Sequence, residues 1–308
     1  MNKEKVFSSL LCQAIFIVFF VAASIRLLTI NKMGKTWDEG AYVEPGYKFI
    51  QLLINRDFNN PFLYMQSDHP PLAKYVYGFV SRFEVKTDPN HEIVFEYNYF
   101  WPRIVSVLLG TLTAVFIVII GFRFFSLYVG FVSGLIFSLM PFFIGLSQLA
   151  TLESFILFFF TICVYFYMEF LVTTNRRNLL FTGITLGLAL LVKQSNIILV
   201  PLLLIISFVF FFFKKNTSLK SFISKNFGDF LYIGIIALIT FFLLWPMPFF
   251  HLMELWAVQN TMWIQNVKLP PPEVFFGRLM LVPFPYYFVM FAITTPLVLL
   301  LLSFVGML

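Results

Sequence analysis

Long apolar segments recur from one end of the chain to the other, and short polar stretches separate them. Apolar runs of about 20 residues are long enough to cross a bilayer as helices. The pattern predicts eight such helices, over residues 8–30, 102–122, 127–148, 151–172, 178–192, 195–213, 229–250 and 284–306. The first run is too long for the core of a secretory signal and lacks a small-residue cleavage site, so we expect it to be retained. The sequence therefore predicts an all-α polytopic membrane protein, with residues 1–308 forming a single module.

Composition agrees with a membrane protein. The chain is 60% hydrophobic and 12% charged, whereas soluble domains carry about 25% charged residues. The two cysteines, Cys12 and Cys163, both fall inside apolar runs, so they predict neither a disulfide framework nor a metal site.

The charged residues predict the orientation of the helices. If the N-terminus is inside, the short inner loops are all positive, through Lys3, Lys5, Arg123, Arg176, Arg177, Lys214, Lys215, Lys220 and Lys225. Short positive loops belong on the cytoplasmic side. The net charge of +6 is then a consequence of topology and requires no nucleic-acid partner. We expect a multi-pass protein of the cell (plasma) membrane, with outer loops at residues 32–97 and 251–283.

The first outer loop, residues 32–97, points most directly to chemistry because it holds nine of the 15 acidic residues. Residues 42–54 and 72–83 have amphipathic patterns, which predict two short helices lying in the membrane interface. Pro71 suits the first turn of the second helix. The second outer loop, residues 251–283, carries aromatic residues of the kind that anchor proteins at the interface.

Asp38 and Glu39 follow the first apolar run directly, between Trp37 and Tyr42. One interpretation of an adjacent acidic pair in an outer loop is that both side chains are simply solvated. The other is functional, because a carboxylate at the bilayer surface can take a proton from an acceptor hydroxyl or hold a divalent cation.

Asp68 and His69 precede the pair Pro70-Pro71. This segment is compatible with a plain turn before a helix. The proline pair also fixes the backbone, so both side chains would be held rigidly, as a catalytic site requires.

Three further ionisable residues lie at predicted helix ends on the outer side. Glu153 is an acid within a spanning segment, which favours function, although a first-turn position also favours an anion through the helix dipole. Lys193 is either a snorkelling lysine at a helix C-terminus or a cation for a lipid-linked phosphate. Arg103 could bind the same phosphate with bidentate geometry.

Taken together, these segments resemble the protein O-mannosyltransferase and lipid A aminoarabinose transferase superfamily, membrane glycosyltransferases of the class C fold (GT-C). The resemblance covers nearly the whole chain and rests on Asp38-Glu39-x-x-Tyr42, Asp68-His69-Pro70-Pro71-Leu72-x-Lys74, Arg103-x-x-Ser106-x-x-x-Gly110, the segments 147–153 and 187–193, and Pro285-Tyr286-Tyr287-Phe288. Gln148 stands where relatives often have a basic residue or His, and Glu153 where many have Asp. Relatives usually continue with more helices, so we expect the chain to be incomplete at its C-terminus.

The resemblance implies a polyprenyl- or dolichyl-phosphate sugar donor and inverting transfer to a protein, lipid or glycan acceptor on the non-cytoplasmic face. By analogy, Asp38 would be the catalytic base. Glu39 and Asp68 would support it or help to bind a divalent metal, the one cofactor that the resemblance allows, with Asp38 and Asp68 as its candidate ligands. The substrate-binding residues would be Tyr42, His69, Lys74, Arg103, Glu153 and Lys193, of which Arg103 and Lys193 face the donor phosphate.

Two other classes of function remain open. A transporter or flippase for a lipid-linked or small polar substrate would place polar groups near the bilayer midplane, often on broken helices. Here the predicted helix centres are almost free of charge, and the polar residues gather at one face. A purely structural membrane subunit would not need the acid-rich first loop.

Overall fold

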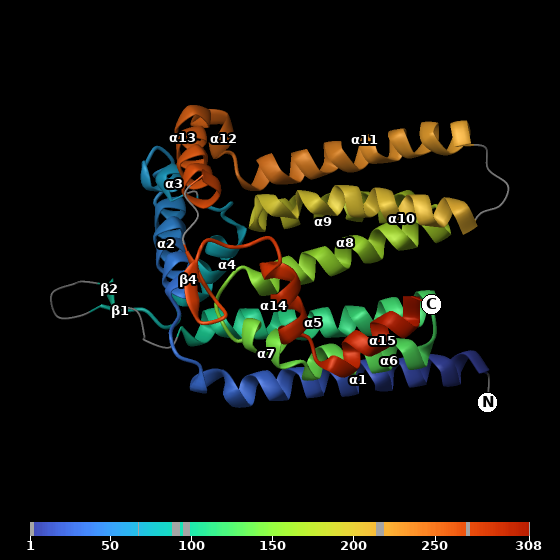
Figure 1. The fold of residues 1–308 in the computed structure, drawn as a ribbon. Helices are drawn as coiled ribbons and strands as arrows, with labels where there is room; N and C mark the ends of the chain where they lie inside the picture. The colour runs from blue at the N-terminus through green and yellow to red at the C-terminus, as the bar shows by residue number, and fades with distance from the viewer. Residues whose placement is uncertain are drawn as a thin grey trace. The chain divides into compact units, whose positions relative to one another are not determined.

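The computed structural model describes residues 3–66, 68–87, 93–94, 99–213, 219–268 and 272–307. Contacts within the chain divide it into two compact units, Met1–His251 and Leu252–Leu308. The first unit contains the long helices, which run alongside one another (Figure 1): α1 (Lys3–Thr29), α5 (Phe100–Phe124), α6 (Leu127–Leu139), α8 (Glu153–Thr173), α9 (Arg176–Val192), α10 (Leu199–Phe213) and α11 (Leu219–Leu244).

The predicted all-α multi-pass architecture is confirmed, but the predicted number of spans is not. In the described ranges, five helical segments are long and apolar enough to cross a membrane, or six if a bent pair counts as one span. The single helix predicted over 127–148 is broken into α6 and α7 (Pro141–Leu146) because proline has no N–H to continue the helix. The last predicted helix likewise bends by 106° between α14 (Tyr286–Thr294) and α15 (Leu297–Met307).

Both helices predicted in the first outer loop are present, as α2 (Trp37–Ile54) and α4 (Leu72–Ser81). The helix α2 begins five residues before the expected start because Thr36 and Glu39 form a capping box. The shorter elements of this unit are η1 (Ile30–Lys32), α3 (Phe62–Met65), β1 (Lys86–Thr87), β2 (Ile93–Val94), η2 (Gln194–Ile198) and α12 (Met247–Phe250).

Helices α2 and α4 cross in direct backbone contact at two glycines. A Cβ atom added to Gly78 would lie 2.0 Å from the carbonyl oxygen of Gly46, and one added to Gly46 would lie 2.2 Å from the carbonyl oxygen of Lys74. The helix α4 also packs against α5 and α9. The α2–α4 pair therefore lies across one end of the long helices (Figure 1), where loop residues and helix ends meet.

The second unit contains α13 (Leu252–Trp263), the π-helical turn η3 (Ile264–Lys268), β3 (Glu273–Phe275), β4 (Arg278–Met280), α14 and α15. The strands β3 and β4 pair antiparallel with Phe275 opposite Arg278, which leaves a two-residue turn. Both turn residues, Phe276 and Gly277, have positive φ, as tight hairpin turns require. The predicted second outer loop thus contains a helix and a hairpin.

Candidate active site

Glu39 and Arg103 form a fully enclosed ion pair that joins α2 to α5. Arg103 Nε donates to Glu39 Oε1 at 2.6 Å and Nη2 donates to Glu39 Oε2 at 2.7 Å. The exposed fractions of the two side chains are 0% for Glu39 and 1% for Arg103. Glu39 Oε1 also accepts from the backbone N–H of Ala150 at 3.0 Å, and Oε2 accepts from that of Thr36 at 3.0 Å.

This pairing assigns a structural role to both residues. Arg103 also donates to the carbonyl oxygens of Ile30, Met33 and Gly34, so five hydrogen bonds engage the five N–H groups of its guanidinium. Burial raises the pKa of Glu39, but bonds from Arg103 and the backbone outweigh it and hold that pKa below its usual value. The prediction that Arg103 faces a phosphate does not fit this geometry, because no donor remains. Glu39 is enclosed within the fold, directly next to Asp38 in the chain.

Asp38 lies beside this pair but points the other way. It occupies the first turn of α2, where the helix dipole stabilises an anion, and it is exposed. Successive residues on a helix differ by about 100° in direction, which turns Glu39 inward and Asp38 outward. The two acids, indistinguishable in sequence, are therefore separated into a buried support and an exposed carboxylate.

Asp68 is held by the buried amine of Lys74. Lys74 Nζ forms an ion pair with Asp68 and donates to the carbonyl oxygen of Gln66 at 2.5 Å. Burial lowers the pKa of Lys74, and the negative charge of Asp68 partly offsets that effect. Lys74 is only 1% exposed, so it anchors Asp68 rather than presenting a cation at the surface, and its predicted contact with substrate does not fit this position.

Tyr42 lies on α2, within electrostatic reach of acids from three parts of the chain. Burial raises the pKa of its phenol, and the negative charges of Asp68, Asp38 and Glu153 raise it further. Asp68 lies in the turn before α4, Asp38 lies in α2, and Glu153 lies in the first turn of α8. The ring centroid of His69 lies 6.0 Å from that of Tyr42. The structure thus brings the separated acidic motifs to one phenol.

His69 connects this cluster to the end of α9. Burial lowers the pKa of His69; Asp68 opposes that effect, while the positive charge of Lys193 lowers the pKa further. A hydrogen bond with the side chain of Gln194 also favours the protonated form. The net lowering favours a neutral imidazole at physiological pH. Lys193, predicted on the outer face, therefore lies within electrostatic reach of the same site.

The remaining side chains of the cluster differ in whether they are already paired. In the described part of the chain, Asp38, Glu153 and Lys193 have no side-chain hydrogen bond or ion pair. Glu39 is paired with Arg103, and Asp68 is paired with Lys74. Among the described residues of the cluster, two carboxylates and one amine therefore remain without an ion pair.

Sequence reasoning missed several residues that hold this site together. Tyr77 is fully buried on α4, and its hydroxyl donates to the carbonyl oxygen of Thr151 at 2.6 Å and lies 2.7 Å from Ser106 Oγ. Arg26 is fully buried in α1 and bonds to Ser147 Oγ at 2.9 Å. A charge inside the first apolar run was a signal that could have identified Arg26.

The residues near Asp38 and Asp68 do not form a closed metal site. Across the described ranges, no group of three or more His, Cys, Asp or Glu side chains could hold a metal ion. Asp68 already bonds to Lys74, which competes with a cation for its oxygens. We therefore derive no chemical step through a metal.

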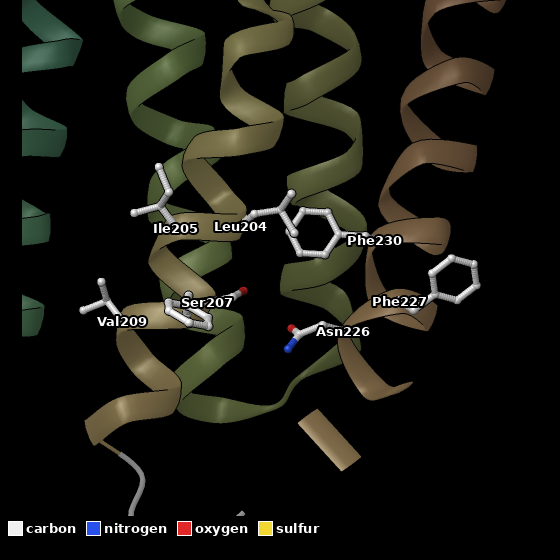
Figure 2. Close-up of a pocket in the computed structure, with 8 residues that line it drawn as sticks. Leu204, Ile205, Ser207, Val209, Asn226, Phe227 and Phe230 are labelled. Atoms are coloured by element: carbon white, nitrogen blue, oxygen red, sulfur yellow. The ribbon is translucent and has the colours of Figure 1, made fainter. Parts of the chain in front are cut away.

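A pocket of about 530 Å3 lies elsewhere, between α10 and α11 (Figure 2). Its lining is apolar except for two residues: Leu204, Ile205, Ser207, Phe208, Val209, Asn226, Phe227 and Phe230. It contains none of the clustered acids and lies between membrane-spanning segments. This apolar lining suits a hydrocarbon chain rather than a polar reaction. The candidate active site is therefore the cluster of ionisable residues at the α2–α4 end of the bundle.

Comparison with known proteins bears on the identity of this fold. A fold search finds the S. cerevisiae protein O-mannosyltransferase Pmt1-Pmt2 complex bound to the sugar donor, with a TM-score of 0.53 and 19% sequence identity. The match covers 83% of this chain and 34% of that chain, so this chain spans about a third of its length. A sequence search of curated proteins gives no match. The model of the family "PMT: Dolichyl-phosphate-mannose-protein mannosyltransferase" matches residues 14–262. Since that match covers most of the sequence and both outer-loop motifs, the chain belongs to the dolichyl-phosphate-mannose-protein mannosyltransferase family.

Proposed function

We propose that this chain is a membrane glycosyltransferase that transfers a mannosyl residue from a dolichyl- or polyprenyl-phosphate donor to an acceptor hydroxyl. The observation that carries the proposal is the exposed carboxylate of Asp38, which has no ion pair among the described residues and adjoins the buried Glu39, in a chain of this family. A protein acceptor follows from the family's name. We place the reaction on the outer face of the plasma membrane, and the positive charge of the short loops expected on the inner side supports this orientation.

The proposed reaction is a single inverting displacement. The carboxylate of Asp38 takes the proton of the acceptor hydroxyl as its oxygen attacks the anomeric carbon. The bond between that carbon and the donor phosphate oxygen breaks, and the lipid phosphate leaves with the electron pair. A phosphate is already a good leaving group, so this step needs a base and a cation rather than a strong acid.

Lys193 is the cation we assign to the leaving phosphate. It is partly exposed at the end of α9 and has no ion pair in the described residues, whereas Arg103 and Lys74 are both occupied. The other side chains of the cluster are the neutral imidazole of His69, the carboxylate of Glu153 and the phenol of Tyr42. We assign these side chains to hydrogen bonding with the sugar or the acceptor.

A transporter or flippase is the less favoured alternative. Its binding groups should lie near the bilayer midplane on discontinuous helices. The candidate site instead gathers residues from helix ends and from interfacial helices (Figure 1), and the family is one of transferases.

The experiment is transfer of radiolabelled mannose from dolichyl-phosphate mannose and from a shorter polyprenyl-phosphate mannose by membranes carrying the chain. Asp38→Asn should lower the rate by roughly 100-fold or more, because a general base contributes on that order. Asp57→Asn is the matched control, since Asp57 is an exposed acid of the same outer loop, and among the described residues its side chain accepts a hydrogen bond only from Asn60, at 2.8 Å. Full activity in Asp38→Asn would show that Asp38 is not the catalytic base. An inactive wild-type chain would refute the proposed transferase activity.

A chelator titration in the same assay tests the metal separately. The lack of a closed donor set among the described residues predicts that EDTA leaves transfer unchanged. Loss of activity with EDTA, restored by one divalent cation, would show that Asp38 and Asp68 bind a metal with help from the substrate.

A further inference from the structure

We propose that Arg26 is a positioning residue for the outer-face site, acting through residues 147–153. These residues connect α7 to α8 and end in Glu153. The catalytic consequence rests on the proposed function above. The structural part of the proposal is that Arg26 determines where this segment lies. That part depends only on the contacts of Arg26 and not on the proposed function.

Arg26 is a charge enclosed by the fold without a countercharge. Its exposed fraction is 0%, and it has no carboxylate partner in the described part of the chain. Among the described residues, its Nη2 atom has no hydrogen-bond partner. A buried charge of this kind is costly, and an arginine retained inside a spanning helix calls for a function.

Two of the three hydrogen bonds that the Arg26 side chain donates connect α1 to the region around the break between α6 and α8. Arg26 Nε donates to Ser147 Oγ at 2.9 Å, and Nη1 donates to the carbonyl oxygens of Ser138 at 3.3 Å and Ala22 at 3.1 Å. Pro141 interrupts the helix just after Ser138, which leaves carbonyl oxygens near the end of α6 without helical donors. Arg26 supplies one of the missing donors and fixes Ser147 at the same time.

The segment held by Arg26 makes further contacts with the site. Gln148 Nε2 donates to the carbonyl oxygen of Arg26 at 2.8 Å, so the segment is bound to the same residue twice. Two residues further on, the N–H of Ala150 donates to Glu39 Oε1, and the carbonyl oxygen of Thr151 accepts from Tyr77. A shift of the segment would therefore move the support beneath Asp38.

Ser147 is packed closely against α5, so the segment cannot shift in that direction without a clash. A Cβ atom added to Gly110 would lie 2.5 Å from Ser147 Cβ, so α5 and the segment are already in close contact. Arg26 on one side and Gly110 on the other hold Ser147 between α1 and α5. Arg26 thus fixes Ser147 and Gln148, and through this segment it fixes the positions of Glu39 and Glu153.

The activity test is a double-mutant cycle on Arg26→Met and Ser147→Ala. Each change should lower kcat by roughly 10- to 100-fold, because a misplacement near 1 Å costs that much, while the KM for the lipid donor stays within about threefold. The double variant should be no slower than Arg26→Met alone, since both changes break one path. Ser138→Ala is the control, because only the backbone carbonyl of Ser138 meets Arg26, and it should leave kcat unchanged.

Arg123→Met serves as the control for general destabilisation. Arg123 is also an arginine near a helix end, but it pairs with Glu169 at the opposite end of α5. Its loss should reduce folded protein without changing the rate per folded molecule. Equal kcat per folded molecule in Arg26→Met and wild type, or additive effects in the cycle, would overturn the positioning role.

A second measurement does not depend on transfer activity. In a chain with Cys12 replaced by Ser, Glu153→Cys is labelled with a membrane-impermeant maleimide. Adding Arg26→Met should change the labelling rate several-fold, and adding Arg123→Met should not. An unchanged rate would refute the structural part of the proposal. If the wild-type chain transfers no mannose, the proposed function fails, while this labelling result still decides the role of Arg26.

Discussion

Replacing Glu39 by Gln tests whether this acid supports the fold or takes part in chemistry. The change leaves Arg103 charged and enclosed, with two of its five donors facing a neutral amide. Hydrogen bonds to a charged group contribute about 1.5–3 kcal/mol each, so losing their charged partner costs about 3–6 kcal/mol. Breaking buried ion pairs on one side typically costs about 3–5 kcal/mol, in agreement with that sum. We expect Glu39→Gln to destabilise the protein by about 3–5 kcal/mol.

Thermal unfolding of the purified protein in detergent is the assay for this prediction. A loss of this size corresponds to a fall in Tm of about 10 °C for a domain of roughly 150–250 residues. The control Asp57→Asn removes an exposed acid of the same loop and should shift the free energy of unfolding by less than about 0.5 kcal/mol. A Glu39→Gln protein with normal Tm and no activity would refute the structural assignment and place Glu39 among the reacting groups.

The remaining predictions concern the crossing of α2 and α4 and two side chains of the site. Gly46→Ala should cost about 3 kcal/mol or more, because its Cβ would lie 2.2 Å from a carbonyl oxygen, whereas Gly34→Ala meets nothing within 4 Å and should be neutral in the same melts. Folding lowers the pKa of His69, so the unfolded state binds more protons, and stability should fall as pH drops below about 6.5; His69→Phe should flatten that part of the stability curve. Lys193→Met should raise the KM for the lipid donor by roughly tenfold, and an unchanged KM would show that Lys193 does not meet the phosphate.

The sequence predicts the long helices well because length and apolar character decide them locally. Runs such as those of α5 and α8 are recovered nearly to their ends. The expectation of one helix over 127–148 was wrong although its signal was present, since Pro141 cannot continue a helix. The bend at Pro296 has the same cause.

The site is predictable as a set of motifs but not as a set of roles. The sequence places Asp38, Asp68 and Glu153 on one side of the membrane, and the structure brings all three to Tyr42. Which of two adjacent acids is buried depends on the direction in which α2 leaves Thr36, and that direction depends on Arg103 and Ala150, far along the chain. The predicted role of Arg103 does not fit its hydrogen bonds, because the sequence shows a cation at a helix start but does not show that Glu39 is its partner.

The pairing of charges is compatible with the anionic donor of the proposed function. If every acid of the cluster were unpaired, their combined charge would repel a lipid phosphate at short range. Arg103 neutralises Glu39 and Lys74 neutralises Asp68, so these four groups add no net charge. The net charge of the site then rests on two carboxylates and Lys193. In the proposed reaction, Lys193 would meet the donor phosphate and Asp38 would meet the acceptor hydroxyl, so the two reactants would approach different groups.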